Sequence, residues 1–377
     1  MAVRTLRRAV KPNDSVLRIG EAKFAVLINP VRNQGMLVLA ANKLGQMLAR
    51  AVSVDQNEVN VTARIGTAMG PEQAGEADDL LQRAETALLA ALTDEQPYAA
   101  YSPAQSERAT ESLGLEAELE NALRKGELEL YYQPKISTAD FRPCGAEALL
   151  RWTNPKRGPI SPDIFIPLAD KTGRIEPLTS FVLNTAVRQS AEWPQHWGPL
   201  TVAVNVTPRV VEDADLCAMV ASAVGMWDAV PNRLFIEITE GAIMKNPAVS
   251  FEVLRRLREQ GVQISIDDFG TGYSSLAYFK NIPADELKID KSFVINMLED
   301  NGDKQIVRTV IDLAKSFGLM VTAEGVEDRP TAEMLAQLRC DRLQGYFYSK
   351  PLPQARFIEW LDAFARAGAP ILATSAP

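Results

Sequence analysis

Residues 264–276 read ISIDDFGTGYSSL, an apolar, β-branched run that ends in two adjacent aspartates and a glycine-rich loop. The run predicts a buried strand, and Asp267 and Asp268 place two carboxylates at its exit. Buried charges of one sign are costly, so this pair needs a cation or a proton to compensate it. The glycines and small polar residues that follow are typical of a loop with unusual backbone angles. Taken alone, the two aspartates have a second interpretation, as caps at the start of a helix.

The composition restricts the chemistry that this chain can carry out. Its 377 residues are enough for two domains, or for one large barrel with an additional piece. The net charge of −8 argues against a broad basic surface, so we expect no duplex DNA or RNA partner. A single histidine, His196, and three widely spaced cysteines argue against a zinc site and against a Ser-His-Asp triad. Any metal site must therefore use oxygen ligands, which favours Mg²⁺ or Mn²⁺.

The sequence also suggests where the chain works. No apolar stretch reaches the roughly 18 residues that a membrane-spanning helix needs, so we expect no membrane span. Residues 1–11 are basic but lack the apolar segment of a signal peptide. Widely separated cysteines without a signal peptide fit a reducing compartment, and we expect a cytoplasmic location.

Composition and periodicity divide the chain into four parts. Residues 1–95 show a small α+β pattern, with two strands, a helix, a strand pair and a second helix at 16–19, 24–28, 37–52, 59–70 and 77–92. Residues 96–112 have the proline- and serine-rich composition of a linker. Residues 113–365 form the main domain, and residues 366–377 are a C-terminal tail.

From residue 128, apolar runs of strand length alternate with helical segments. The eight predicted strands lie at 128–133, 146–152, 201–206, 234–239, 262–267, 286–290, 319–323 and 342–347. Two of the helices between them, at 247–260 and 304–317, stop at Gly261 and Gly318. Eight strands with interleaved helices over about 240 residues predict an α/β fold of the (β/α)₈ barrel type. A doubly wound open sheet is the alternative, but the glycine-rich first turn of dinucleotide-binding sheets is absent.

Polar residues lie in or just after most of the predicted strands. They are Glu147, Asn205, Glu237, Asp267 with Asp268, Lys288, Glu324 and Gln344. Because the carboxyl ends of barrel strands surround one mouth, we expect these side chains to converge there. Carboxylate and amide oxygens suit one or two divalent ions, and two ions can activate a water and stabilise a departing oxygen in phosphoester cleavage. A lysine among them either orients or deprotonates that water, or serves only as a stabilising salt bridge.

Several motifs in this order resemble the EAL domain, the cyclic di-GMP phosphodiesterase family. The matching segments are Tyr132–Gln133–Pro134, Glu147–Ala148–Leu149–Leu150–Arg151–Trp152, Val204–Asn205–Val206, Glu237–Ile238–Thr239–Glu240, the run from Asp267 to Leu276, Leu287–Lys288–Ile289–Asp290, Ala323–Glu324–Gly325–Val326–Glu327 and Gln344–Gly345–Tyr346. The resemblance covers residues 113–362. It implies a modified (β/α)₈ barrel that hydrolyses cyclic di-GMP to linear pGpG and so lowers this second messenger in bacterial signalling.

The resemblance also implies a role for each matching residue. The metal ligands would be Glu147, Asn205, Glu237, Asp267, Asp268 and Glu324, with Asp267 bridging two ions of Mg²⁺ or Mn²⁺. The catalytic residues would be Glu147, Asp267, Lys288 and Glu324, with Lys288 holding or activating the water. The substrate contacts would be Gln133, Leu149, Arg151, Asn205 and Gln344. Glu240 would anchor a loop that contributes to a homodimer through the barrel and includes Phe269, Gly270, Thr271, Gly272, Tyr273 and Ser274.

The N-terminal part resembles the C-terminal half of a diguanylate cyclase (GGDEF) domain. Residues 18–24, RIGEAKF, stand at the place of the Gly-Gly-Asp-Glu-Phe motif, and the helix at 77–92 resembles a late helix of that domain. Glu21, Ala22 and Lys23 replace Gly-Asp-Glu, and the upstream half with its phosphate and metal groups is absent. We therefore expect a truncated, degenerate domain at 1–95, without cyclase activity, that serves packing or dimerisation, with nucleotide sensing as the alternative.

Two further functions remain open from the sequence. One is a catalytically inactive receptor that binds cyclic di-GMP in the same barrel and signals through residues 1–112. Substitution of Glu147, Asp267 or Lys288 would support that reading, and all three are present. The other, reached only without the resemblance, is a carboxylate-and-metal barrel enzyme of the enolase or aldolase kind. The set of polar residues in or after the predicted strands contains no second lysine or histidine base for it.

Overall fold

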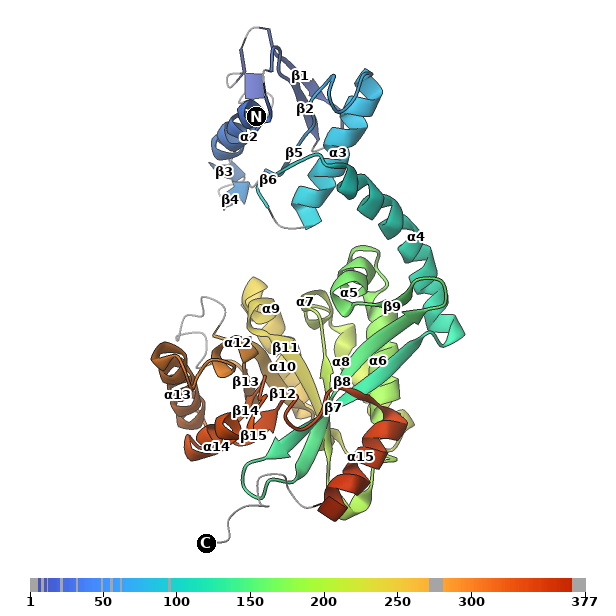
Figure 1. Ribbon diagram of the computed structural model, residues 1–377, viewed down its shortest axis with the longest axis vertical. Helices are drawn as coiled ribbons and strands as arrows, with labels where there is room; N and C mark the ends of the chain where they lie inside the picture. Colours follow the sequence, from blue (N-terminus) through green and yellow to red (C-terminus); the bar gives the residue numbers. More distant parts are fainter. Residues whose placement is uncertain are drawn as a thin grey trace. The chain divides into compact units, whose positions relative to one another are not determined.

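The computed structural model describes two compact units, Met1–Leu115 and Glu116–Pro377 (Figure 1). The described residues are 6–7, 10–11, 13–20, 23–31, 33–48, 50–54, 57–61, 63–93, 96–270 and 281–367. Among them, no helix is both long enough and apolar enough to cross a membrane.

The first unit is a small α+β arrangement. Its elements are β1 (Ser15–Arg18), β2 (Phe24–Leu27), α2 (Gln34–Leu48), β3 (Arg50–Val54), β4 (Asn57–Val61), β5 (Ile65–Thr67), α3 (Ala77–Thr93) and β6 (Tyr98–Ala100). The predicted hairpin is present, because β1 and β2 pair antiparallel. The strands predicted within 59–70 do not pair with each other: β4 pairs with β3, and β5 runs parallel to β6. The helix predicted to reach residue 52 ends at Leu48, since the alternating valines of residues 50–54 favour a strand.

Helix α4 (Pro103–Lys125) replaces most of the predicted linker and crosses the boundary between the two units. Pro103 suggested a break, but proline is well tolerated in the first turn of a helix. The alanine, glutamate, leucine and arginine residues that follow are strong helix formers. Their combined propensity outweighs the linker signals that precede them.

The second unit contains a closed barrel. Its strands are β7 (Leu128–Ser137), β8 (Pro143–Asn154), β10 (Thr201–Asn205), β11 (Leu234–Thr239), β12 (Gln263–Phe269), β13 (Glu286–Ile289), β14 (Met320–Ala323) and β15 (Arg342–Gln344). Each strand pairs with the next, and β7 closes the ring by pairing with both β8 and β15. Two short strands, β9 (Gly158–Ile160) and β16 (Leu352–Pro353), extend the sheet beside β8 and β7. The predicted eight-stranded α/β barrel is confirmed.

One strand departs from the regular barrel. β7 runs antiparallel to both of its neighbours, whereas the pairs from β8 through β15 are parallel. A short turn joins β7 directly to β8, and a connection of that length permits only antiparallel pairing. Gln133 therefore reaches the mouth from the middle of a strand, opposite Glu147, and not from a carboxyl end.

Helices surround the barrel in Figure 1. They are α5 (Pro162–Lys171), α6 (Ile175–Ser190), α7 (Pro208–Val211), α8 (Asp215–Met226), α9 (Glu240–Lys245), α10 (Pro247–Glu259), α12 (Lys291–Val294), α13 (Asn301–Ser316), α14 (Arg329–Gln337) and α15 (Gln354–Ala367). Short 3₁₀ turns lie at Gln195–Trp197 and Pro231–Arg233.

Helices α10 and α13 show how the sequence sets the outer layer. Leu254 and Leu257 of α10 are fully buried, and burying such a side chain contributes about 1.5–3 kcal/mol. In α13 the inner face carries Val307, Val310, Ile311 and Ala314, whereas Ile306 and the following Phe317 are exposed. Both helices stop where predicted, at Gly261 and Gly318, whose φ values of 86° and 73° terminate a helix at little cost for glycine.

Candidate active site

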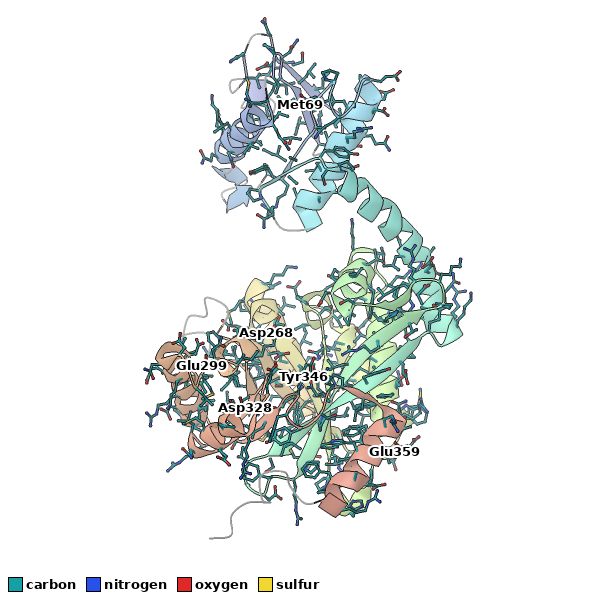
Figure 2. All side chains as sticks on the ribbon, in the orientation of Figure 1. Met69, Asp268, Glu299, Asp328, Tyr346 and Glu359 are labelled. Carbon is teal, nitrogen blue, oxygen red and sulfur yellow. The ribbon has the colours of Figure 1, made fainter. Side chains whose placement is uncertain are left out.

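Strand β12 carries the two aspartates on an irregular backbone. The pairing of β12 with β13 shifts register between Ile266 and Phe269, which is the mark of a β-bulge. Within it Asp268 has a φ of 54°, and its N–H donates to Oδ1 of Asp267 over 2.9 Å. Regular strand neighbours point to opposite faces, so the bulge allows both carboxylates to serve one site. Asp268 lies near the end of β12 in Figure 2.

Three carboxylates form a group suited to a cation. Oxygen atoms of Asp267, Asp268 and Glu324 all lie within 4.8 Å of one another. Glu324 directly follows β14, two strands from β12 in the sheet. Hard carboxylate oxygens at this spacing fit Mg²⁺ or Mn²⁺, and the donor set contains no soft ligand.

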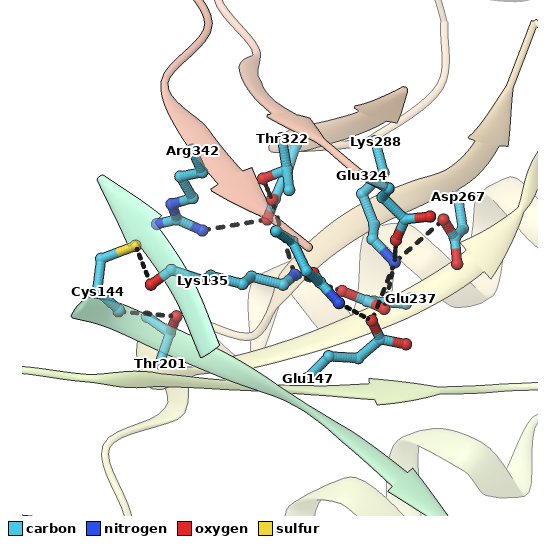
Figure 3. Close-up of polar contacts among 12 residues, drawn as sticks. Lys135, Cys144, Glu147, Thr201, Glu237, Asp267, Lys288, Thr322, Glu324 and Arg342 are labelled. Carbon is cyan, nitrogen blue, oxygen red and sulfur yellow. Dashed lines mark hydrogen bonds and ion pairs between the residues drawn. The ribbon is translucent and has the colours of Figure 1, made fainter. Parts of the chain in front are cut away.

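Lys288 joins this acidic group to the rest of the mouth. Its Nζ lies 2.6 Å from Glu324 Oε1, 2.8 Å from Glu237 Oε2, 3.1 Å from Asp267 Oδ1 and 3.6 Å from Glu147 Oε2. The side chain is fully buried on β13, and Figure 3 shows these ion pairs as dashed lines (Figure 3). One ammonium group therefore contacts four carboxylates from four different strands or strand ends.

The amide side chains predicted for the site lie around Glu147. Asn205 Nδ2 donates to Glu147 Oε1 over 2.6 Å, and Gln344 Nε2 donates to Glu147 Oε2 over 2.6 Å. Gln344 also donates to Gln133 Oε1, 3.1 Å away. These bonds fix both oxygens of Glu147, so its carboxylate is oriented before any ligand arrives.

Burial and charge shift the pKa values of these carboxyl groups in opposite directions. Burial, reinforced by the charges of Asp267 and Glu147, raises the pKa of Glu324 to about 8. Burial likewise raises the pKa of Glu147, and burial with the Asp267 charge raises that of Asp268. Glu237 is equally buried, but Lys135 and Lys288 outweigh burial and lower its pKa to about 2. Glu237 thus stays ionised although its carboxylate is fully buried.

Lys135 is a buried contact that the sequence reasoning missed. Its Nζ lies 2.5 Å from Glu237 Oε1, on the side of Glu237 opposite to Lys288. The sequence spacing could have indicated Lys135, because it lies two residues beyond Gln133 and alternate residues of a strand share a face. The predicted strand ended at Gln133, whereas β7 continues to Ser137.

The other residues of the predicted site lie around these groups, and part of the predicted loop falls outside the described residues. Leu149 and Arg151 lie beyond Glu147 on the same face of β8, both half-buried, with the Arg151 guanidinium 5.8 Å from the centre of the Tyr131 ring. Tyr346 follows β15 and is exposed (Figure 2). Glu240 Oε2 accepts a hydrogen bond from the Gly270 N–H over 3.1 Å, and Phe269 is buried. The other predicted loop residues, Thr271, Gly272, Tyr273 and Ser274, lie outside the described residues.

Two family models match this chain. Residues 116–351 match the model described as the EAL domain, and residues 1–96 match the model described as the diguanylate cyclase, GGDEF domain. Among the proteins similar in sequence to this chain are two from Pseudomonas aeruginosa. The bifunctional diguanylate cyclase/cyclic di-GMP phosphodiesterase MucR is 35% identical over 358 residues, covering 94% of this chain and 52% of MucR. The cyclic di-GMP phosphodiesterase NbdA is 36% identical over 370 residues, covering 97% of this chain and 47% of NbdA. The chain spans about half the length of these relatives.

Solved structures resemble this chain over 64% and 77% of its length. A structure described as the PaMucR phosphodiesterase in complex with c-di-GMP has a TM-score of 0.61 at 39% identity, covering 64% of this chain and 98% of the solved one. The enzyme Bd1971, solved with cAMP and cyclic di-GMP bound, has a TM-score of 0.64 at 29% identity, covering 77% of each chain.

Proposed function

Because this chain belongs to the EAL-domain family and carries a partial GGDEF domain before the barrel, we propose that it hydrolyses cyclic di-GMP to linear pGpG. The strongest support is the completeness of the site. Glutamates, aspartates, one asparagine, one glutamine and one lysine meet at one mouth of the barrel, joined by hydrogen bonds and ion pairs. Relatives over 30% identical are named as cyclic di-GMP phosphodiesterases.

The residues of the mouth fit a pair of divalent ions. Glu147, Asn205, Glu237 and Asp267 would hold one Mg²⁺ or Mn²⁺ ion, and Asp267, Asp268 and Glu324 would hold the second. Such ions supply an activated water and offset the charge on a departing phosphoester oxygen. The β12 bulge supports a shared role for Asp267, because it lets Asp268 serve the same site, and Glu324 after β14 completes the group of three carboxylates.

The protein's own groups hold the reaction centre together. Lys288 offers a fixed ammonium group between Glu147, Asp267 and Glu324, where it can orient the attacking water and limit repulsion among the carboxylates. Gln344 keeps Glu147 in place through a hydrogen bond, and Gln133 accepts a second hydrogen bond from the same Gln344 amide. Leu149 and Arg151 follow Glu147 on the same face of β8 and would contact the nucleotide, and Arg151 is suited to a phosphate or a guanine edge.

We also assign a loop role to Glu240. Its hydrogen bond to the Gly270 N–H ties α9 to the end of β12, directly beside Asp268. This bond would couple the metal ligands to the 269–274 loop and, through it, to a second copy of the chain in a homodimer. Light scattering of the wild type and of Glu240→Gln tests the dimer: loss of dimer in the variant supports the coupling, and a monomeric wild type contradicts it.

The proposed activity is tested with purified protein, cyclic di-GMP and Mg²⁺ or Mn²⁺, with pGpG followed by chromatography. We expect turnover by the wild type and none by Glu147→Ala, with cooperative thermal unfolding for both. The matched control is Glu359→Ala, which removes an exposed glutamate of α15 and should keep full activity. Turnover by Glu147→Ala would refute the metal assignment. Tight binding without turnover at saturating metal would favour the receptor function.

A further inference from the structure

A second set of charged side chains lies inside the barrel, one layer below the mouth. It consists of Lys135 on β7, Glu286 on β13 and Arg342 on β15, with the hydroxyl of Thr322 on β14. Lys135, Glu286 and Thr322 are fully buried, and the side chain of Arg342 is 12% exposed. We call these four residues the lower charge cluster (Figure 3).

Lys135 connects the lower charge cluster to the proposed metal site. Three steps round the sheet separate β7 from β11, so the side chain crosses the barrel interior to reach Glu237. Its Nζ lies 2.5 Å from Glu237 Oε1, while Lys288 Nζ lies 2.8 Å from Glu237 Oε2. Each oxygen of Glu237 thus has its own lysine. A carboxylate held at both ends cannot rotate without losing a charged hydrogen bond.

The rest of the lower charge cluster holds Lys135. Glu286 Oε1 lies 3.8 Å from Lys135 Nζ and accepts a hydrogen bond from the Thr322 hydroxyl. Arg342 NH1 lies 3.1 Å from Glu286 Oε2, and its guanidinium stacks 5.1 Å from the centre of the Phe235 ring. Phe235 precedes Glu237 by two residues on the same face of β11. Glu286 is thus held by side chains from β14 and β15, and it is the residue of the lower charge cluster that contacts Lys135 directly.

Stability alone does not account for this arrangement. Removing several charges from water is expensive, and buried ion pairs are often no more stabilising than apolar side chains of the same volume. A fixed orientation for Glu237 is something that apolar side chains could not provide. Groups behind metal ligands orient them, and losing such a group commonly costs 10–100-fold in metal affinity or activity.

We infer that Lys135 is a positioning residue for the metal site, which sets the orientation of Glu237, and that Glu286 acts on the site through Lys135. This inference rests on the proposed function, because it takes Glu237 as a metal ligand. Lys135 itself touches neither the metal nor the nucleotide. Its effect reaches the reaction only through Glu237.

The test measures Mn²⁺ binding to EDTA-treated protein by calorimetry, without nucleotide, for the wild type, Lys135→Met and Glu286→Gln. We expect Lys135→Met to bind Mn²⁺ about tenfold more weakly, with a smaller loss for Glu286→Gln. For cyclic di-GMP hydrolysis by Lys135→Met, kcat should fall by a larger factor than KM changes. The matched control, Lys315→Met, removes a half-exposed lysine paired with Asp341 and should bind Mn²⁺ like the wild type.

Whether Lys135→Met binds Mn²⁺ more weakly or more tightly than the wild type distinguishes a positioning role from a simple electrostatic effect. Removing a positive charge near carboxylates would by itself strengthen cation binding, so equal or tighter Mn²⁺ binding by Lys135→Met overturns the inference. If Lys135→Met does not fold, Lys135→Gln, which removes the same positive charge and keeps an unbranched polar side chain, decides in the same way. A wild type that binds no Mn²⁺ refutes the proposed function. A wild type that binds Mn²⁺ with affinity equal to that of the variants refutes only the role of the lower charge cluster.

Discussion

Glu324 shows how burial changes an ordinary carboxyl group at the mouth of the barrel. With a pKa of about 8, it is largely protonated at pH 7 in protein without bound cation. A divalent ion requires the ionised form, so binding must displace this proton. Metal affinity is therefore expected to rise as the pH increases from 6 to 8 and to level off above that.

Proton release gives a direct measurement of this effect. Calorimetric titration of EDTA-treated protein with Mn²⁺ in two buffers of different ionisation heat should show proton release at pH 7, and less release at pH 9. Glu324→Gln should release fewer protons than the wild type at pH 7. Binding heats that do not depend on the buffer would contradict the placement of Glu324 in the metal site.

Lys288 is expected to contribute most to the stability of the fold when no divalent ion is bound. Lys288→Met leaves four buried carboxylates without their shared cation, and breaking a buried ion pair commonly costs about 3–5 kcal/mol. The variant should unfold at a lower temperature than the wild type in EDTA. Added Mn²⁺ should raise its Tm more than that of the wild type, as measured by differential scanning fluorimetry. Equal Tm values in EDTA would show that Lys288 does not compensate the carboxylates. In either metal state we expect no turnover.

At the scale of single elements, the turn after β15 is the tightest point near the site. A Cβ atom on Gly345 would overlap the backbone of Val326, whose N–H donates to Gln344 O over 3.1 Å. Gly345→Ala is expected to lower the free energy of unfolding by about 1–3 kcal/mol, since overpacking forces the backbone apart. It should also reduce turnover, because Gln344 would move away from Glu147. Chemical denaturation measures the first effect.

Gly225→Ala is the matched control for Gly345→Ala. Gly225 lies in α8, and a Cβ atom there would meet nothing within 4 Å. Alanine favours a helix over glycine, so this variant should be as stable as the wild type or slightly more stable. Equal stability of Gly345→Ala and Gly225→Ala would mean that the close approach of Gly345 to the Val326 backbone is not required for stability.

The elements that the sequence predicted well are those with a clear period and a clear end. Strand β12 and helices α10 and α13 combine a continuous or periodic apolar pattern with terminal aspartates or glycines. Strand β7 and helix α4 were predicted less well. The reversed direction of β7 depends on its pairing with β8 and β15, which no local pattern encodes, and the proline and serine residues of 96–112 concealed the start of α4.

The same limit applies to the site. Residues in or just after apolar strands, such as Glu147, Lys288 and Glu324, could be found one strand at a time. The bulge at Asp268 and the contact of Lys135 with Glu237 depend on backbone geometry and on side chains 102 positions apart in sequence. Metal binding, catalysis and substrate contacts by these residues stay predictions.

At the scale of the whole molecule, we expect the barrel to work without the first unit. The solved MucR phosphodiesterase chain corresponds to 64% of this chain and is itself 98% covered, which supports an independent barrel. A fragment of residues 103–377, which keeps α4 entire, should fold cooperatively and hydrolyse cyclic di-GMP within about twofold of the full-length rate, since a domain with its own core folds alone. Circular dichroism and the pGpG assay test this. A folded but inactive fragment would assign an essential role to residues 1–102.

The proposed function depends most directly on metal-dependent hydrolysis in the barrel. The decisive measurement is the rate of pGpG formation by EDTA-treated full-length protein as Mn²⁺ is titrated back, at a fixed concentration of cyclic di-GMP. We predict no turnover before Mn²⁺ is added, a saturable rise as it binds, and no rise for Asp267→Asn. Turnover in EDTA, or none at saturating Mn²⁺ while cyclic di-GMP is bound, would contradict it.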